Sequence, residues 1–289
     1  ELANVINDPA PVDGVASDRQ YPICLRCHGD TYASVLGTLP LLSGAIPSNK
    51  RIEFQTANSS YHPVAGPGRN TSNNLNLQLS GAGLSTNSVL KCTDCHTNDS
   101  YETTTGTSAD APVGPHGSTY PSILRAFYQN SLPGPNNWDP ANFDLCFRCH
   151  NENMLIARRW GDGARTNFYD DDKDNLHYVH LDDRADKSRP TCRSCHYNVH
   201  SNQETTTTQY RIDGVVYTTP PPDTPTRLIN FHPSIRATGT RARPEWRIDT
   251  GTGLRQCYLQ CHRSNGNPGG EVMNGADHRY TGPPSGDVP

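Results

Sequence analysis

The stretch Lys91-Cys92-Thr93-Asp94-Cys95-His96 holds two cysteines separated by two residues and followed directly by a histidine. The same order recurs at residues 24–28, 146–150 and 192–196, and at residues 257–262 with one additional residue between the cysteines. Together these five motifs use all ten cysteines of the 289-residue chain. Cys-x-x-Cys-His is the attachment signature of c-type haem, in which both thiols form thioethers to the macrocycle and the histidine ligates the iron.

We therefore predict five covalently attached haems c. The attachment cysteines are Cys24, Cys27, Cys92, Cys95, Cys146, Cys149, Cys192, Cys195, Cys257 and Cys261, and the proximal iron ligands are His28, His96, His150, His196 and His262. Zinc sites and disulfide frameworks also use paired cysteines, but neither explains a histidine after every pair. The lengthened fifth motif is the weakest of the five, although the sequence offers Cys257 no other partner.

The composition argues against a large hydrocarbon core. Hydrophobic residues make up 33% of the chain, which also contains 24 glycines and 24 prolines, and this apolar fraction is low for a soluble domain. The formal net charge of −4 gives no indication of nucleic-acid binding, and no apolar run is long enough for a transmembrane helix. We expect a mostly irregular fold with short α-helices, organised around a chain of five haems whose apolar faces replace the missing core.

The expected organisation is an N-terminal extension over residues 1–20, a single pentahaem unit over 21–280 and a flexible C-terminal tail over 281–289. We expect a local helix at each attachment motif, with the best support over residues 143–160. The alternating apolar residues that flank Asp213-Gly214 predict a minor β-hairpin.

The second axial ligand of each iron decides the function. A haem with one protein ligand has an open face that can bind small molecules, whereas a haem with two ligands mainly carries electrons. The chain has only two methionines, so histidine must supply most distal ligands. We predict that five of the seven remaining histidines do so and suspect that His232 and His278 are idle. The predicted distal ligands are His62, His116, His177, His180 and His200.

The sequence context supports some of these assignments. His177 and His180 are three residues apart, a spacing that would place both on one short helix. His200 follows His196 by four residues and is expected to point toward a neighbouring haem instead of its own. His62 and His116 follow turn-forming residues, which suits a loop that delivers one imidazole.

The stretch from Lys91 to His96, through Gly114-Pro115-His116-Gly117-Ser118 to Tyr120-Pro121-Ser122-Ile123-Leu124, resembles the multihaem c-type cytochromes of metal-reducing microbes, as do residues 145–150 and 192–200. It is similar in particular to their extracellular, filament-forming (nanowire) cytochromes. That resemblance implies bis-histidine haems in a continuous chain, with an axial histidine sometimes donated between subunits. The lengthened fifth motif departs from the pattern, as does His232, which stands where an acidic residue is expected.

These observations predict an electron-transfer protein and not an enzyme, acting as a subunit of an extracellular conductive filament. Its expected partners are copies of itself, redox proteins or extracellular acceptors, without nucleic acid and without a transmembrane segment. The alternative is a multihaem reductase for nitrite, hydroxylamine or metal with one open haem. Haem c is attached outside the cytoplasm, so we expect an extracellular or cell-surface location, or else the periplasm, and a targeting peptide removed before Glu1.

Overall fold

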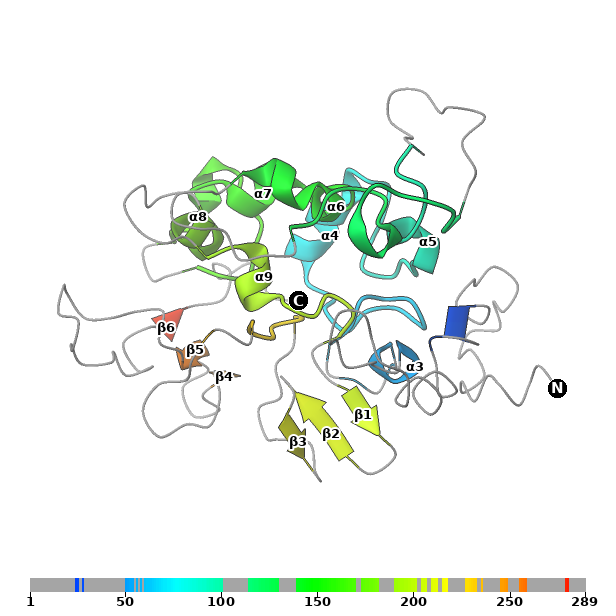
Figure 1. Cartoon of the computed structure of the whole chain (residues 1–289). Coiled ribbons are helices and arrows are strands. Elements are labelled where there is room, and N and C mark those ends of the chain that lie inside the picture. The colour runs from blue at the N-terminus through cyan, green and yellow to red at the C-terminus, as the bar shows by residue number, and fades with distance from the viewer. Residues whose placement is uncertain are drawn as a thin grey trace. The chain divides into compact units, whose positions relative to one another are not determined.

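The structure, a computed structural model, is shown in Figure 1. It describes residues 24, 25, 28, 50–54, 56, 58, 60–100, 114–129, 139–169, 173–181, 190–201, 204–206, 209–212, 215–217, 227–232, 235, 245–248, 255–258 and 279–280. Several predicted features lie outside these residues. They are the attachment cysteines Cys27 and Cys261, the iron ligand His262, the idle candidate His278 and the terminal segments 1–20 and 281–289.

The helices are short, which agrees with the coil-rich fold that the composition predicts. The α-helices are α3 (Lys50–Glu53), α4 (Asn73–Ser80), α5 (Cys92–Cys95), α6 (Asp144–Phe147), α7 (Glu152–Ile156), α8 (Leu176–Leu181) and α9 (Cys192–Cys195), and the 3-10 helices are η2 (Pro121–Ile123), η3 (Pro140–Phe143) and η4 (Trp160–Asp162). Among the described residues, no helix has the length and apolar character needed to cross a membrane.

Within the described residues, six short strands form two antiparallel sheets of three strands each. One sheet has the order β1 (Glu204–Thr206), β2 (Gln209–Ile212) and β3 (Val215–Tyr217), and the other has the order β4 (Glu245–Ile248), β5 (Arg255–Tyr258) and β6 (Arg279–Tyr280). Strands β2 and β3 pair with Ile212 opposite Val215. The expected turn residues between them, Asp213 and Gly214, lie outside the described residues.

The expectation of a helix at every attachment motif is wrong for the fifth motif. Helices α5, α6 and α9 carry motif cysteines, but Cys257 lies in strand β5, opposite Trp246 of β4. The additional residue does not itself forbid a helix, since residues four apart also share a helix face. Strand pairing with the β-prone residues of β4 then decides the local structure.

The chain divides into two compact units. Unit 1 comprises residues 1–69, 87–128 and 199–219, and unit 2 comprises residues 70–86, 129–198 and 220–289. The first two motifs belong to unit 1, and α6 and α9 belong to unit 2.

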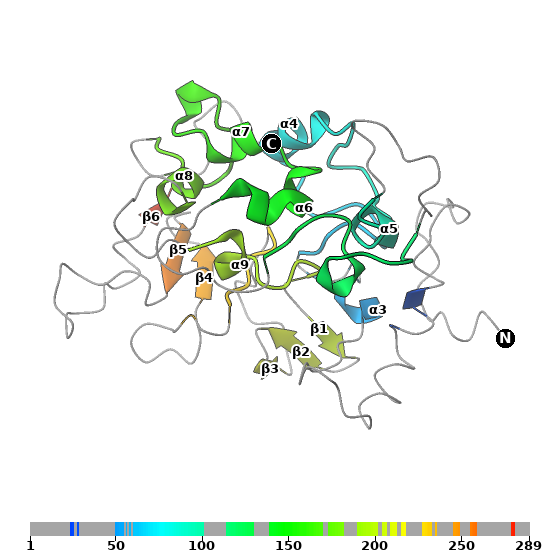
Figure 2. The same cartoon turned by 45° about the horizontal axis from the view of Figure 1, so that its top comes forward.

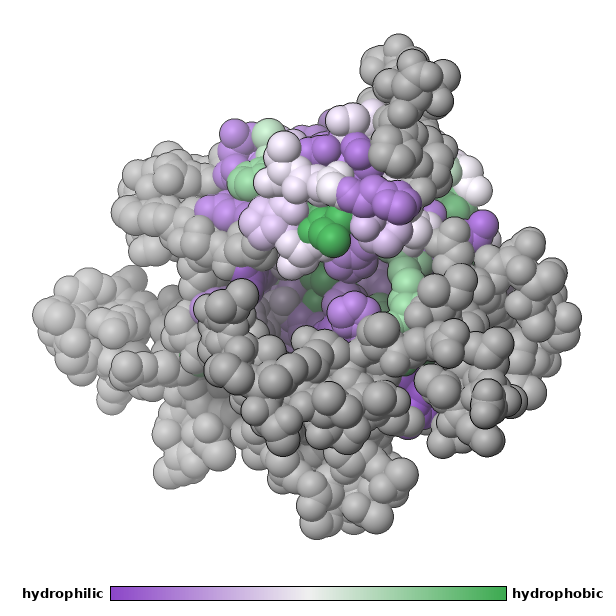
Figure 3. Space-filling view, turned by 45° about the vertical axis from the view of Figure 1, so that its right-hand side comes forward, coloured by the Kyte–Doolittle hydropathy of each residue, from purple (hydrophilic) through white to green (hydrophobic). Residues whose placement is uncertain are grey.

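Apolar clusters in the described residues are small and gather at the attachment cysteines. In unit 1, Leu25 and Val64 are buried together, with Cys92 packed against them. In unit 2, Phe231 and Trp246 are buried together, with Cys195 among their neighbours. Buried polar side chains are at least as numerous as buried hydrophobic ones in the described part of the chain. The face drawn in Figure 3 likewise mixes hydrophilic and intermediate residues with a few hydrophobic ones.

Buried amide side chains hold unit 2 together where a hydrocarbon core would otherwise do so. Asn74 of α4 donates from Nδ2 to the Thr166 carbonyl at 2.6 Å. The Asn175 amide donates to the carbonyls of Leu155 (2.6 Å) and Ala157 (2.8 Å) and thereby ties the end of α7 to the start of α8. Figure 2 shows α4 beside α7, as expected from the bond between the Asn151 N–H and the Gln78 carbonyl.

Candidate haem sites

Three of the attachment motifs share one backbone arrangement. In each, the histidine N–H donates to the carbonyl of the first cysteine, at 2.8 Å for His96, 3.0 Å for His150 and 2.8 Å for His196. This bond closes a single helical turn, so the two cysteines and the histidine are held within one turn of each other. The C-x-x-C-H spacing thus produces the same local fold in both units.

The residue before the second cysteine fixes where two of these helices begin. The Asp94 carboxylate accepts from the Lys91 N–H at 2.7 Å, and the Ser194 hydroxyl accepts from the Thr191 N–H at 3.0 Å. Each side chain satisfies a backbone donor just ahead of the helix, as one half of a capping box does. One of the two variable positions in the motif therefore has a structural role.

Two proximal histidines are oriented by main-chain carbonyls far along the sequence. His96 Nδ1 donates to the Ser122 carbonyl at 2.8 Å, and His196 Nδ1 donates to the Leu228 carbonyl at 2.7 Å. Because a carbonyl oxygen can only accept, Nδ1 carries a proton, and the neutral form of each ring keeps its lone pair on Nε2. Metal-bound histidines are held in this way by a partner on the second nitrogen.

The segments that supply these carbonyls have an uncommon backbone. Ser122 and Ile123 have φ angles of 65° and 54°, and Arg227 and Leu228 have φ angles of 70° and 57°. Residues other than glycine rarely adopt this left-handed backbone region, and such strain is typical of functional positions. Sequence reasoning missed this role, because neither pair contains the glycine that would have indicated it.

The predicted distal ligands His62 and His180 make the same kind of hydrogen bond from Nδ1. His62 Nδ1 donates to the Val199 carbonyl, and His180 Nδ1 donates to the Leu176 carbonyl at 2.6 Å. Each ring is thereby fixed, and its Nε2 keeps a lone pair for a metal.

Helix α8 contains both His177 and His180, as the spacing predicts. Both rings pack on Phe168, with centroid distances of 5.3 and 5.7 Å. Burial and the neighbouring histidines lower the pKa of His177 to about 3, so its imidazole is neutral, which is the form that binds metals. Within the described residues, its buried Nδ1 has no hydrogen-bond partner.

His200 differs from the other histidines because its Nδ1 meets a carboxylate, Glu53 Oε2, at 2.9 Å. Burial lowers the pKa of His200, and the hydrogen bond to Glu53 opposes that effect. Its ring centroid lies 6.2 Å from that of His96 in the same unit. A metal–nitrogen bond of about 2 Å on each side, plus roughly 1 Å from each Nε2 to its ring centre, separates two imidazoles on one metal by about 6 Å. The spacing of His96 and His200 therefore fits one iron between them.

The remaining predicted ligands differ in their exposure. His28 and His116 are exposed, and the His116 loop is shaped by left-handed Gly114 (φ 115°) and Gly117 (φ 138°). His150 is half-buried. The ligand roles of these three residues stay predictions. His232, which the sequence suggests is idle, packs edge-on against Tyr197 with a centroid distance of 4.9 Å.

The electrostatics of the cysteine thiols differ from motif to motif. The hydrogen bond with Cys92 lowers the pKa of Cys24 to about 6. Burial raises the pKa of Cys146 to about 12 and raises the pKa of Cys192 as well. In the described part of the chain, no group of three or more histidine, cysteine or acidic side chains is placed to hold a metal ion directly.

Comparison with known families supports the same chemistry. Residues 86–155 match a family described as a doubled CXXCH motif, and this match spans the second and third motifs. It supports a multihaem c-type cytochrome with covalently bound haem c. No curated protein and no solved structure matches the chain.

Proposed function

We propose that this chain carries electrons through five covalently bound haems c, each ligated by two histidines, and that it is not an enzyme. The observation that supports this most is that histidines inside and outside the motifs make the same kind of hydrogen bond from Nδ1. His96 and His196 inside motifs, and His62, His180 and His200 outside them, all have Nδ1 bound by an oxygen acceptor. Nε2 of each ring therefore keeps a lone pair for iron, as bis-histidine ligation requires.

When bound, haem c supplies a one-electron iron couple. The chain contributes the remaining features of the site. The single-turn segments at the motifs present two thiols from one turn. The carbonyls that accept from His96 and His196 fix the tautomer of those imidazoles. Burial keeps His177 neutral. A second histidine on each iron would close the face that a reductase needs for its substrate.

Electron paramagnetic resonance of the oxidised holoprotein tests this proposal. We expect low-spin ferric signals throughout, together with a haem-to-protein ratio of five from the pyridine haemochrome assay. A sizeable high-spin population in the intact protein would instead favour a reductase for nitrite, hydroxylamine or metal with one open iron.

We also propose that the protein acts outside the cell as a subunit of a conductive filament. The support is the resemblance of residues 91–124 to filament-forming cytochromes and the small apolar clusters of the two units. At high concentration, purified holoprotein should form polymers that are visible by electron microscopy and light scattering. Monomers alone under these conditions would refute the filament role and leave the electron-transfer role intact.

A further inference from the structure

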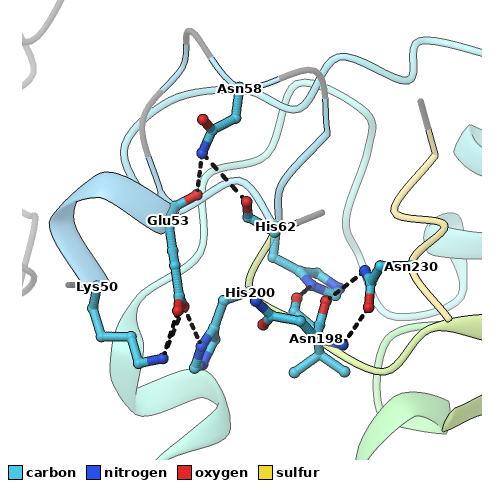
Figure 4. Close-up of polar contacts among 9 residues, drawn as sticks. Lys50, Glu53, Asn58, His62, Asn198, His200 and Asn230 are labelled. Carbon is cyan, nitrogen blue, oxygen red and sulfur yellow. Dashed lines mark hydrogen bonds and ion pairs between the residues drawn. The ribbon is translucent and has the colours of Figure 1, made fainter. Parts of the chain in front are cut away.

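Glu53, at the end of helix α3, is a buried carboxylate with a specific partner. Its side chain is 1% exposed. Lys50 Nζ donates to its Oε1 and Oε2 at 2.8 and 2.9 Å, and His200 Nδ1 donates to Oε2 at 2.9 Å. Figure 4 shows the carboxylate between these two side chains. An isolated buried carboxylate is costly, and these two donors compensate for its burial.

The surrounding hydrogen bonds hold this pair from both sides. Asn58, which is fully buried, donates from Nδ2 to the Glu53 carbonyl at 2.6 Å and to Ser201 Oγ at 3.3 Å. The His200 carbonyl accepts from the His62 N–H at 3.0 Å. The residue next to His200 is thus tied to the backbone of Glu53, so the geometry of the pair is determined by the fold of unit 1.

The Glu53 carboxylate distinguishes His200 from the four other histidines whose Nδ1 donates to an oxygen acceptor. His62, His96, His180 and His196 donate to neutral main-chain carbonyls. A hydrogen bond to an ionised acceptor is roughly twice as strong as one between neutral groups. It draws the Nδ1 proton toward the acceptor and makes Nε2 a stronger electron donor, which favours the more positively charged ferric iron.

We propose that Glu53 is a positioning residue that sets the reduction potential of the iron bound by His200. It fixes the His200 ring, whose centroid lies 6.2 Å from that of His96, and keeps that potential lower than a carbonyl partner would. This inference rests on the proposed function, in which His200 is a distal ligand.

The test is Glu53→Gln in the holoprotein, followed by spectroelectrochemical titration. Glutamine retains an oxygen acceptor for His200 Nδ1 but removes the charge. We expect a low-spin spectrum and about a tenfold rise in the equilibrium constant for reducing one haem, a positive shift of about 59 mV for one electron. Asp162→Asn, on η4 of unit 2, removes the same charge from an exposed site that is not next to a predicted ligand in the sequence, and it should not shift any midpoint.

Lys50→Met provides a second measurement of the same interaction. Without the Lys50 ammonium, the carboxylate interacts more strongly with His200, so one midpoint should fall. That fall should be lost in the Glu53→Gln/Lys50→Met double variant, whereas a direct effect of the Lys50 charge would persist.

Unchanged midpoints in both single variants, with the low-spin spectrum retained, would overturn the role of Glu53 while leaving bis-histidine ligation standing. High-spin iron in Glu53→Gln would also overturn it, because glutamine should hold the ring. High-spin iron in the unaltered protein would instead contradict the proposed function.

Discussion

The chain will not fold cooperatively when it is produced without haem attachment. The described apolar clusters are built around Leu25 and Val64 in unit 1 and around Phe231 and Trp246 in unit 2. Each cluster includes an attachment cysteine, so the haem would bury its apolar face there. Without that contribution, such small clusters cannot offset the conformational entropy of ordering the chain, and the free energy of unfolding should be close to zero.

Urea denaturation and amide hydrogen exchange of the apoprotein measure this directly. The holoprotein from a host that attaches haem is the control and should show a cooperative transition with protected amides. Native-like protection in the apoprotein would mean that the polypeptide has a sufficient core of its own.

Replacing His200 with alanine will open one iron. Because His96 and His200 are separated by the distance that two imidazoles on one metal require, losing His200 should leave that haem with His96 alone. About one haem in five should then convert from low to high spin, and carbon monoxide should bind to the reduced protein. Both changes are measurable by optical and electron paramagnetic resonance spectroscopy.

His232→Ala is the matched control, because His232 packs against Tyr197 and is not among the predicted iron ligands. It should leave every haem low-spin. A His200→Ala protein with an unchanged spectrum would show that His200 does not bind iron, and the role proposed for Glu53 would fail with it.

The sequence was most informative where function depends on local spacing. The C-x-x-C-H order predicts the single-turn helices α5 and α9, and the three-residue spacing of His177 and His180 places both on α8. The helical stretch expected over 143–160 is divided into separate helices: α6 ends at Phe147, and Asn151 starts α7 by accepting from the Met154 N–H at 3.0 Å. The apolar pattern there did not reveal that the cap begins a second helix.

Sequence reasoning could not identify the partners of four histidines, because these partners lie far away along the chain. The four are His62, His96, His196 and His200. Glu53 and His200 are 147 residues apart, and nothing near Glu53 indicates a buried carboxylate. The left-handed backbone at Ser122 and Leu228 was equally hidden, since the constraint comes from a histidine elsewhere in the same unit.

The use of main-chain carbonyls at His96 and His196 has a consequence for mutational robustness. Every residue type carries the same carbonyl, and this group does not titrate. Substitutions at Ser122 or Leu228 that preserve the backbone should therefore leave the proximal imidazoles unaffected, over a wide range of pH. The bond between His200 and Glu53 depends on a side chain, so a single codon change at Glu53 removes it, whereas no side-chain substitution removes the carbonyls that accept from His96 and His196.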